Sequence, residues 1–143
     1  MFHKETEYAL RAMVFIRVKN LEDEWPGSVA ISEEIQAPVH FIAKILQRLV
    51  RQGLLSSQKG KRGGFYFTEE QAQESVMKVV EATEGSKIFT ACGMGISQCS
   101  ADNPCPLHDR FASIRSNLYD TLSEESIANL AQKYQENPNY QLF

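Results

Sequence analysis

Two short helical segments followed by a hairpin, in the first half of the chain, constrain the fold more than any other feature of the sequence. The first segment is predicted to begin at Ser28, whose hydroxyl can cap a helix, and to end near Gln36. The second is predicted to run from Pro38, where a missing N–H costs nothing, to about Gln52, with Gly53 as its stop. The apolar side of this second segment is formed by Phe41, Ile42, Ile45, Leu46 and Leu49.

The hairpin pattern consists of two short predicted strands, residues 54–59 and 65–68, joined by the turn Gly60-Lys61-Arg62-Gly63-Gly64. A longer helix is predicted before this region, over residues 6–18, and another after it, over residues 74–84. Two helices joined by a tight turn and followed by a basic hairpin form a winged helix-turn-helix. In that fold the second helix enters the major groove of DNA. The expected fold class is mainly α (α+β).

The charge distribution is uneven along the chain. The net charge is −3, yet residues 37–68 carry six Lys and Arg and no Asp or Glu. All eighteen acidic residues lie elsewhere, together with the other nine basic residues. A basic segment in an acidic chain indicates a local site for a polyanion. The alternative is a winged helix that binds another protein.

The predicted DNA contacts come from the second short helix and from the wing. His40 and Lys44 lie one turn apart near the start of the helix, so they can reach base edges. Arg48 and Arg51 lie further along and are expected to contact phosphates. The cationic wing suits the backbone or a narrow minor groove. The complete predicted set is His40, Lys44, Gln47, Arg48, Arg51, Lys59, Lys61 and Arg62.

All three cysteines lie in one irregular stretch, with the spacing C-x6-C-x5-C-x2-H from Cys92 through Cys99 and Cys105 to His108. Residues 87–103 are rich in Gly, Ser and Cys, and bound metal would explain so long an irregular segment. Thiolates are soft ligands that suit iron–sulfur clusters and zinc. The spacing fits a cluster, a Cys3His zinc site with His108 as the fourth ligand, or a reversible disulfide.

A long amphipathic helix is predicted from Pro106 onward, and Ser123 is predicted to cap a final helix that ends near Tyr134. An apolar helix face is as often monomer core as dimer interface, so periodicity alone fits both. The predicted interface residues are Leu107, Phe111, Ile114, Leu118 and Leu122. We therefore expect a DNA-binding domain (residues 1–84), a cluster-binding loop (85–105), and a dimerisation helix with a C-terminal helix (106–143).

Other classes of protein fit the sequence poorly. No apolar run approaches the roughly 20 residues that span a bilayer, and the first residues lack the pattern of a secretory signal. We therefore expect a cytoplasmic protein without a membrane partner, in which thiols stay reduced. No nucleophile–base pair or phosphate loop is evident, so we do not expect an enzyme.

The chain resembles the IscR/NsrR-type family of winged-helix transcription regulators over essentially its whole length. The resemblance rests on residues 6–12 (TEYALRA), 31–34 (ISEE), 53–57 (GLLSS) and 59–65 (KGKRGGF), and above all on the three-cysteine loop before a long helix. Two features depart from the pattern. The first cysteine gap is six residues where about five is usual, and His40, Ala43 and Lys44 differ from the usual base-reading residues.

The resemblance implies a homodimer on a pseudo-palindromic operator in double-stranded DNA. It also implies a [2Fe–2S] or [4Fe–4S] cluster on Cys92, Cys99 and Cys105, with a fourth ligand that is not cysteine. In one branch that ligand corresponds to His108, and in another to Glu7 donated by the partner subunit. Glu7 is equally well explained as a first-turn acid favoured by the helix dipole.

The predicted function is transcription regulation, with an operator affinity set by a cluster that senses nitric oxide, redox state or iron–sulfur status. A repressor is the class named for such a regulator, and the residues themselves fit repression and activation alike. A regulator with structural zinc or a thiol–disulfide switch is the alternative.

Overall fold

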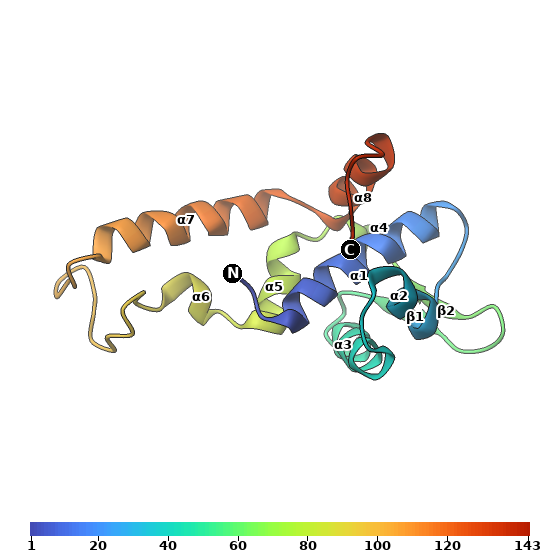
Figure 1. Cartoon of the computed structure of the whole chain (residues 1–143), viewed down its shortest axis with the longest axis horizontal. Coiled ribbons are helices and arrows are strands. Elements are labelled where there is room, and N and C mark those ends of the chain that lie inside the picture. The colour runs from blue at the N-terminus through green and yellow to red at the C-terminus, as the bar shows by residue number, and fades with distance from the viewer.

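The computed structural model describes residues 1–143 and contains eight helices and one two-stranded sheet (Figure 1). The helices are α1 (Lys4–Leu21), α2 (Ser28–Ile35), α3 (Val39–Arg51), α4 (Glu69–Ala72), α5 (Val76–Glu84), α6 (Lys87–Thr90), α7 (His108–Glu124) and α8 (Ile127–Glu136). The strands β1 (Ser56–Gln58) and β2 (Gly64–Tyr66) pair antiparallel, with Ser57 opposite Phe65. The mainly α fold with a small wing is confirmed.

The turn between α2 and α3 differs from the prediction by one residue. Gln36 has a left-handed conformation, with a φ of 54°, and ends α2. Pro38 is extended, with φ −61° and ψ 127°, so it caps α3 instead of being its first residue. Its carbonyl accepts the N–H of Ile42 at 3.0 Å. Gly53 has a φ of +77° and follows α3, as the predicted stop requires.

Both wing strands are shorter than predicted, because the apolar residues at their ends pack into the core instead of extending the sheet. Leu54, Leu55 and Phe67 are all buried. The free edge of β2 is held by the α1–α2 connection, where the Phe65 N–H donates to the Pro26 carbonyl at 2.9 Å. The wing is therefore fixed to the body at its base, and its charged tip projects.

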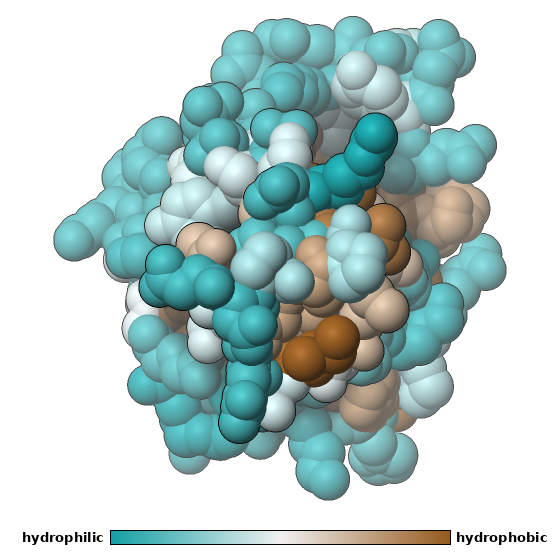
Figure 2. Space-filling model, turned by 90° about the vertical axis from the view of Figure 1, so that its left-hand side faces the viewer, coloured by the Kyte–Doolittle hydropathy of each residue, from teal (hydrophilic) through white to brown (hydrophobic).

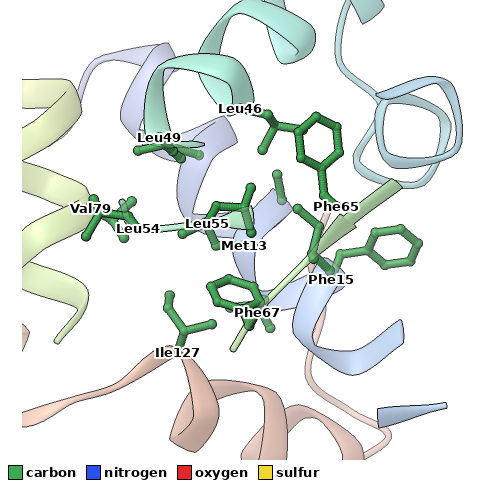
Figure 3. Close-up of a cluster of buried hydrophobic side chains, with 14 of the residues drawn as sticks. Met13, Phe15, Leu46, Leu49, Leu54, Leu55, Phe65, Phe67, Val79 and Ile127 are labelled. Atoms are coloured by element: carbon green, nitrogen blue, oxygen red, sulfur yellow. The ribbon is translucent and has the colours of Figure 1, made fainter. Parts of the chain in front are cut away.

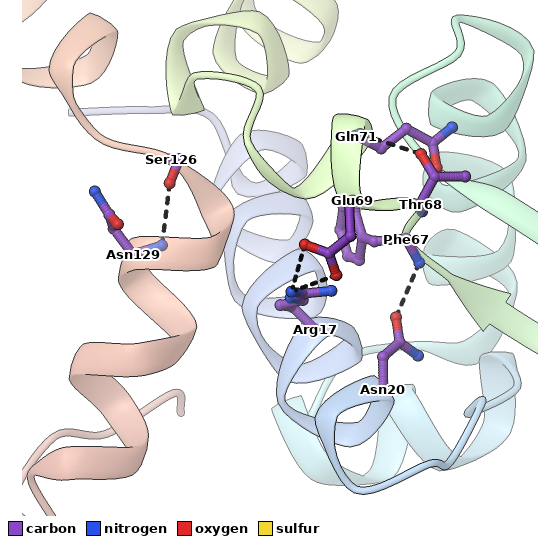
Figure 4. A network of polar contacts seen from close by, with 8 residues as sticks. All are labelled: Arg17, Asn20, Phe67, Thr68, Glu69, Gln71, Ser126 and Asn129. Carbon is purple, nitrogen blue, oxygen red and sulfur yellow. Dashed lines mark hydrogen bonds and ion pairs between the residues drawn. The ribbon is translucent and has the colours of Figure 1, made fainter.

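The end of α1 also holds the wing. The side-chain amide of Asn20 donates to the Phe65 carbonyl at 3.2 Å. Its oxygen accepts the Phe67 N–H at 2.9 Å (Figure 4). Arg17 on the same helix is buried and contacts the Glu69 carboxylate at 3.0 Å. These polar contacts link the end of α1 to β2 and to the residues that follow it.

The core is centred on α1. Ala9, Ala12 and Ile16 have no exposed surface, and α1 packs against α2, α3, α5, α8 and β2. Figure 3 shows how side chains from α1, α3, the wing, α5 and α8 meet in one cluster. The last helix, α8, lies against α1 and contributes Ile127 and Ala131 to this same core.

Other helix caps also differ from the prediction. Ser28 does not cap α2: it is the first residue of that helix, and Gly27 occupies the cap position without a side-chain hydrogen bond. Thr68 and Gln71 form a capping box that starts α4, a helix absent from the prediction. The cap of the last helix is Ser126, whose hydroxyl accepts the Asn129 N–H at 3.0 Å (Figure 4). The predicted cap, Ser123, is wrong, because α7 continues through it to Glu124.

Residues 85–121 form an extension that we call the arm. It contains α6, the cysteine-containing connection and most of α7, and it projects to the left of the body in Figure 1. The predicted irregular stretch starts with one helical turn, α6, and is otherwise without regular structure. At the far end of α7, Leu122 is buried in the core and anchors the arm.

Replacing Leu46 with Ala is expected to lower the free energy of unfolding by about 2–5 kcal/mol. Leu46 is completely buried on the side of α3 that faces the core. Urea denaturation followed by circular dichroism measures the change. Lys44→Ala, on the exposed side of the same helix, is the control and should change stability by less than about 0.5 kcal/mol. Equal effects of the two substitutions would contradict the packing described.

Candidate metal centre and nucleic-acid interface

The three predicted thiols meet in space within the arm. Cys92 follows α6, Cys99 lies in the middle of the connection, and Cys105 precedes α7. Their Sγ atoms all lie within 4.8 Å of one another, and those of Cys92 and Cys105 are 3.7 Å apart. Three convergent, partly buried thiols form a ligand set for a soft metal centre.

His108 adds an imidazole to this cysteine group. It is the first residue of α7, and its Nδ1 lies 3.1 Å from the Cys99 Sγ. The Cys105 backbone N–H donates to the same sulfur at 3.4 Å. Because His108 lies one turn beyond Cys105, the start of α7 brings a nitrogen donor to the thiols. The structure therefore brings four of the predicted ligands together.

Glu7, the other predicted fourth ligand, lies on α1 and pairs with Lys4 at 2.8 Å. Hydrogen bonding and charge from Lys4 keep the pKa of the Glu7 carboxyl below its usual value. Glu7 is not part of the convergent cysteine group of its own chain, so it would reach a metal only from a partner subunit.

Two of the thiols differ in acidity. Backbone hydrogen bonds from Ile96 and Met94 lower the pKa of Cys92 to about 7. Burial raises the pKa of Cys105. Since the thiolate is the form that binds metal and attacks electrophiles, Cys92 is more readily available in that form at neutral pH than Cys105 is.

The apolar stripe of α7 divides between two environments. Leu122 is buried in the core, Leu118 packs against that core, and Phe111 lies against Gly93 of its own chain. Leu107 and Ile114 remain 43% and 59% exposed. Three of the five predicted interface residues are therefore covered within one chain, which periodicity alone did not indicate.

The exposed edge of α7 continues onto the cysteine connection. Met94 and Ile96 are also largely exposed, at 52% and 45%. Figure 2, which looks onto this end of the molecule, shows hydrophobic surface gathered between hydrophilic residues. The arm therefore presents apolar side chains to solvent beside the thiols.

The predicted DNA contacts lie on the opposite side of α3 from the core. His40, Lys44, Gln47 and Arg51 are exposed, whereas Ile42, Ile45, Leu46 and Leu49 are buried. A groove between α3 and the wing is lined by residues that include Gln47, Arg51 and Lys59. The helix and the hairpin thus present polar and basic side chains around this groove, with Lys61 and Arg62 at the wing tip.

Arg48 is the exception in this predicted set. Its guanidinium forms an ion pair with Glu5 on α1, and both side chains are about one-third exposed or less. None of Lys44, Arg51, Lys59, Lys61 and Arg62 forms an ion pair within the chain. Arg48 therefore joins α3 to α1, a role that sequence reasoning missed, while the other cations stay available to an anionic ligand.

A helix-turn-helix with a basic wing, joined to an arm with clustered thiols, defines a winged-helix transcription regulator with a candidate metal centre. Residues 2–133 match the Rrf2 family, described as iron-dependent transcriptional regulators. The chain belongs to the Rrf2 family. Its members are regulators and not enzymes, in agreement with the prediction.

Individual relatives agree with this assignment. The chain is 30% identical to the transcriptional repressor NsrR of Streptomyces coelicolor over 104 residues, covering 73% of this chain and 66% of the relative. It is 26% identical to the transcriptional regulator IscR of Photorhabdus laumondii over 123 residues, 86% of this chain and 74% of the relative. Among solved structures, the global cysteine regulator CymR of Bacillus subtilis aligns with a TM-score of 0.75 at 16% identity. That alignment covers 93% of this chain and 97% of CymR.

The likeness to CymR concerns the fold alone, and it confirms the winged-helix architecture. None of the helices has both the length and the hydropathy required to cross a bilayer.

Replacing Lys61 and Arg62 together with Ala is expected to flatten the salt dependence of DNA binding. Each lost phosphate contact makes the slope of log K against log salt shallower by about 0.9. The slope of the double variant should therefore be shallower by roughly 1.8. Fluorescence anisotropy with a random-sequence duplex at several salt concentrations measures the slope. Lys87→Ala, on α6 of the arm, is the control and should leave it unchanged. An unchanged slope in the wing variant would show that the wing tip does not contact DNA phosphates.

Proposed function

We propose that this chain is a DNA-binding transcription regulator whose affinity for its operator is controlled by an iron–sulfur cluster on Cys92, Cys99 and Cys105, with His108 as the fourth ligand. The observation that carries the proposal is the convergence of three thiols within 4.8 Å, with the His108 Nδ1 at 3.1 Å from the Cys99 Sγ. Membership of a family described as iron-dependent supports it independently.

The donor set is chemically suited to iron. Three thiolates and one imidazole are soft or borderline ligands, and iron–sulfur clusters with histidine in place of cysteine are an established type. The connection has little regular structure, so it can spread to the size of a cluster. His108 is favoured over Glu7 because its nitrogen already lies at the thiols, whereas Glu7 pairs with Lys4.

A single zinc ion is the second candidate, and one distance favours it. Tetrahedral Zn–S bonds of about 2.3 Å place two sulfurs about 3.8 Å apart, and the Cys92 and Cys105 Sγ atoms are 3.7 Å apart. The same proximity would permit a reversible disulfide. Both alternatives keep the DNA-binding function and change only the signal.

A bound cluster would supply a centre that reacts with nitric oxide or oxygen, or that is lost when iron is scarce. The ligand residues determine which bond to the metal would break first. His108 is the single non-thiolate donor, so the bond it makes is expected to be the weakest of the four. Since His108 begins α7 and Cys105 lies just before it, loss of the bound metal would free the connection from the start of that helix.

The root of the arm is tied to the first turn of α1. The buried Glu84 carboxylate accepts the Thr6 hydroxyl at 2.7 Å and the His3 N–H at 3.0 Å, immediately before the arm begins. In the same turn Glu5 pairs with Arg48 of α3. The arm and the recognition helix therefore share one attachment, which is a physical route by which cluster state would change the position of α3.

The proposal includes a homodimer on a pseudo-palindromic operator. The exposed edge of α7 at Leu107 and Ile114, with Met94 and Ile96 beside it, is apolar surface for the second copy. The two DNA-binding domains (residues 1–84 of each subunit) would then contact half-sites about one helical turn, roughly 34 Å, apart. In this arrangement residues 1–84 read DNA, residues 85–105 hold the metal, and α7 within residues 106–143 pairs the subunits.

Protein purified without air is expected to be coloured and to contain iron and acid-labile sulfide. His108→Ala should change the visible spectrum and speed the loss of iron, because it removes the nitrogen ligand. Glu7→Gln is the matched control at the other candidate position and should leave both unchanged. Visible absorption with iron and sulfide analysis provides the measurement.

Two outcomes would contradict this assignment. A colourless protein with stoichiometric zinc would replace the cluster with the second candidate. A coloured protein in which Glu7→Gln alters the spectrum and His108→Ala does not would transfer the fourth ligand to Glu7 of the partner subunit.

A further inference from the structure

The first half of the cysteine connection lies along α7 and is held there by side chains of that helix. The Arg115 guanidinium donates to the Ala91 carbonyl at 3.0 Å, one residue before Cys92. Phe111, one turn earlier on α7, lies against Gly93, one residue after Cys92. Cys92 is therefore held on both sides by the helix that begins just after Cys105.

The contact at Gly93 leaves no room for a side chain. A Cβ atom at this position would lie 2.6 Å from carbons of the Phe111 ring, closer than real contacts allow. Only glycine lets the backbone approach the ring so closely. Further along, Phe89 meets Tyr119 edge to face, with ring centroids 5.7 Å apart. The backbone of residues 89–93 thus follows a single face of α7.

This arrangement restrains Cys92, the proposed ligand that is farthest in sequence from His108. Cys105 and His108 are placed by the start of α7, whereas Cys92 lies thirteen residues before Cys105 and needs a separate restraint. Arg115 supplies a directional hydrogen bond, and its planar guanidinium is already organised for the contact. A ligand that is positioned before metal arrives loses less conformational entropy on binding.

We propose that Arg115 is a positioning residue for the metal site, which holds Cys92 in its liganding position through the Ala91 carbonyl. The inference rests on the proposed function, because it assigns Arg115 a role at that same site. Arg115 touches the backbone beside a ligand and is not itself a ligand.

The test uses Co²⁺ as the probe in metal-free, reduced full-length protein under anaerobic conditions, with the thiolate–Co²⁺ absorption as the signal. Arg115→Ala is expected to raise the Kd for Co²⁺ about tenfold, equivalent to about 1.4 kcal/mol. Arg115→Lys should recover most of the affinity, since an ammonium can still donate to the carbonyl. Arg110→Ala is the matched control on the exposed side of α7 and should bind as the unchanged protein does.

A second readout reports on Cys92 alone. In metal-free Arg115→Ala, alkylation of Cys92 by iodoacetamide should accelerate several-fold relative to that of Cys99, as mapped by peptide mass spectrometry. General loosening of the arm would increase the alkylation rates of Cys92 and Cys99 equally. Gly93→Ala, which disturbs the neighbouring contact without removing a charge, should also weaken Co²⁺ binding.

The outcomes separate the two proposals. If the unchanged protein gives no thiolate–Co²⁺ band, the proposed metal function fails. If the unchanged protein binds Co²⁺ and Arg115→Ala binds it equally well, the positioning role alone is overturned. The same holds if the alkylation rates of Cys92 and Cys99 increase equally in Arg115→Ala. Circular dichroism of each variant checks that the helices are retained, and loss of helix in both Arg115 variants together with normal binding by Gly93→Ala also counts against the role.

Discussion

The burial of α1 is the constraint on which the rest of the structure depends. This helix packs against α2, α3, α5, α8 and β2, and its small residues Ala9 and Ala12 allow neighbouring backbones to come close. The recognition helix, the wing and the base of the arm are thus all positioned by one element. The first turn of α1 has an additional role, since Glu5 meets Arg48 of α3 while His3 and Thr6 hold Glu84 at the root of the arm. A displacement of the arm would therefore act on the same turn that holds the recognition helix.

The arm is built on a different principle from the body. Its connection buries no large apolar residue, and it is restrained by thiol and imidazole contacts at one end and by Arg115 and Phe111 at the other. Segments with few buried contacts are the ones that open most easily. A ligand that joins Cys92, Cys99 and Cys105 would therefore change the order of the arm far more than that of the body. This difference in stability is what a sensor of metal status requires.

Sequence patterns predicted the DNA-binding domain well, because its elements are determined by local periodicity, caps and turn glycines. The α2–α3 pair, the stop at Gly53 and the charged wing tip follow from residues close together in the chain. The capping box of Thr68 and Gln71 was a readable signal for α4 that was overlooked. Choosing Ser123 over Ser126 as the last cap was wrong because both serines precede suitable helical sequence, and only the length of α7 distinguishes them.

The site was predicted in composition but not in arrangement. The spacing of Cys92, Cys99, Cys105 and His108 indicated a shared metal centre. It did not indicate that the residues beside Cys92 contact Phe111 and Arg115, which are distant in sequence. Periodicity identified the apolar face of α7 without indicating that Phe111, Leu118 and Leu122 are covered within the chain while Ile114 is exposed. Tertiary packing decides such questions, and one sequence does not report it.

The central claim is that metal occupancy of the arm changes the affinity of the DNA-binding domain for its operator. The most direct measurement compares the cluster-loaded and cluster-free forms of the same preparation, without air and at one fixed salt concentration, for binding to an operator selected from genomic fragments. The account predicts at least a tenfold difference in Kd, which corresponds to about 1.4 kcal/mol of coupling. Equal affinity of the two forms would contradict it, because the arm and α3 would then be mechanically independent.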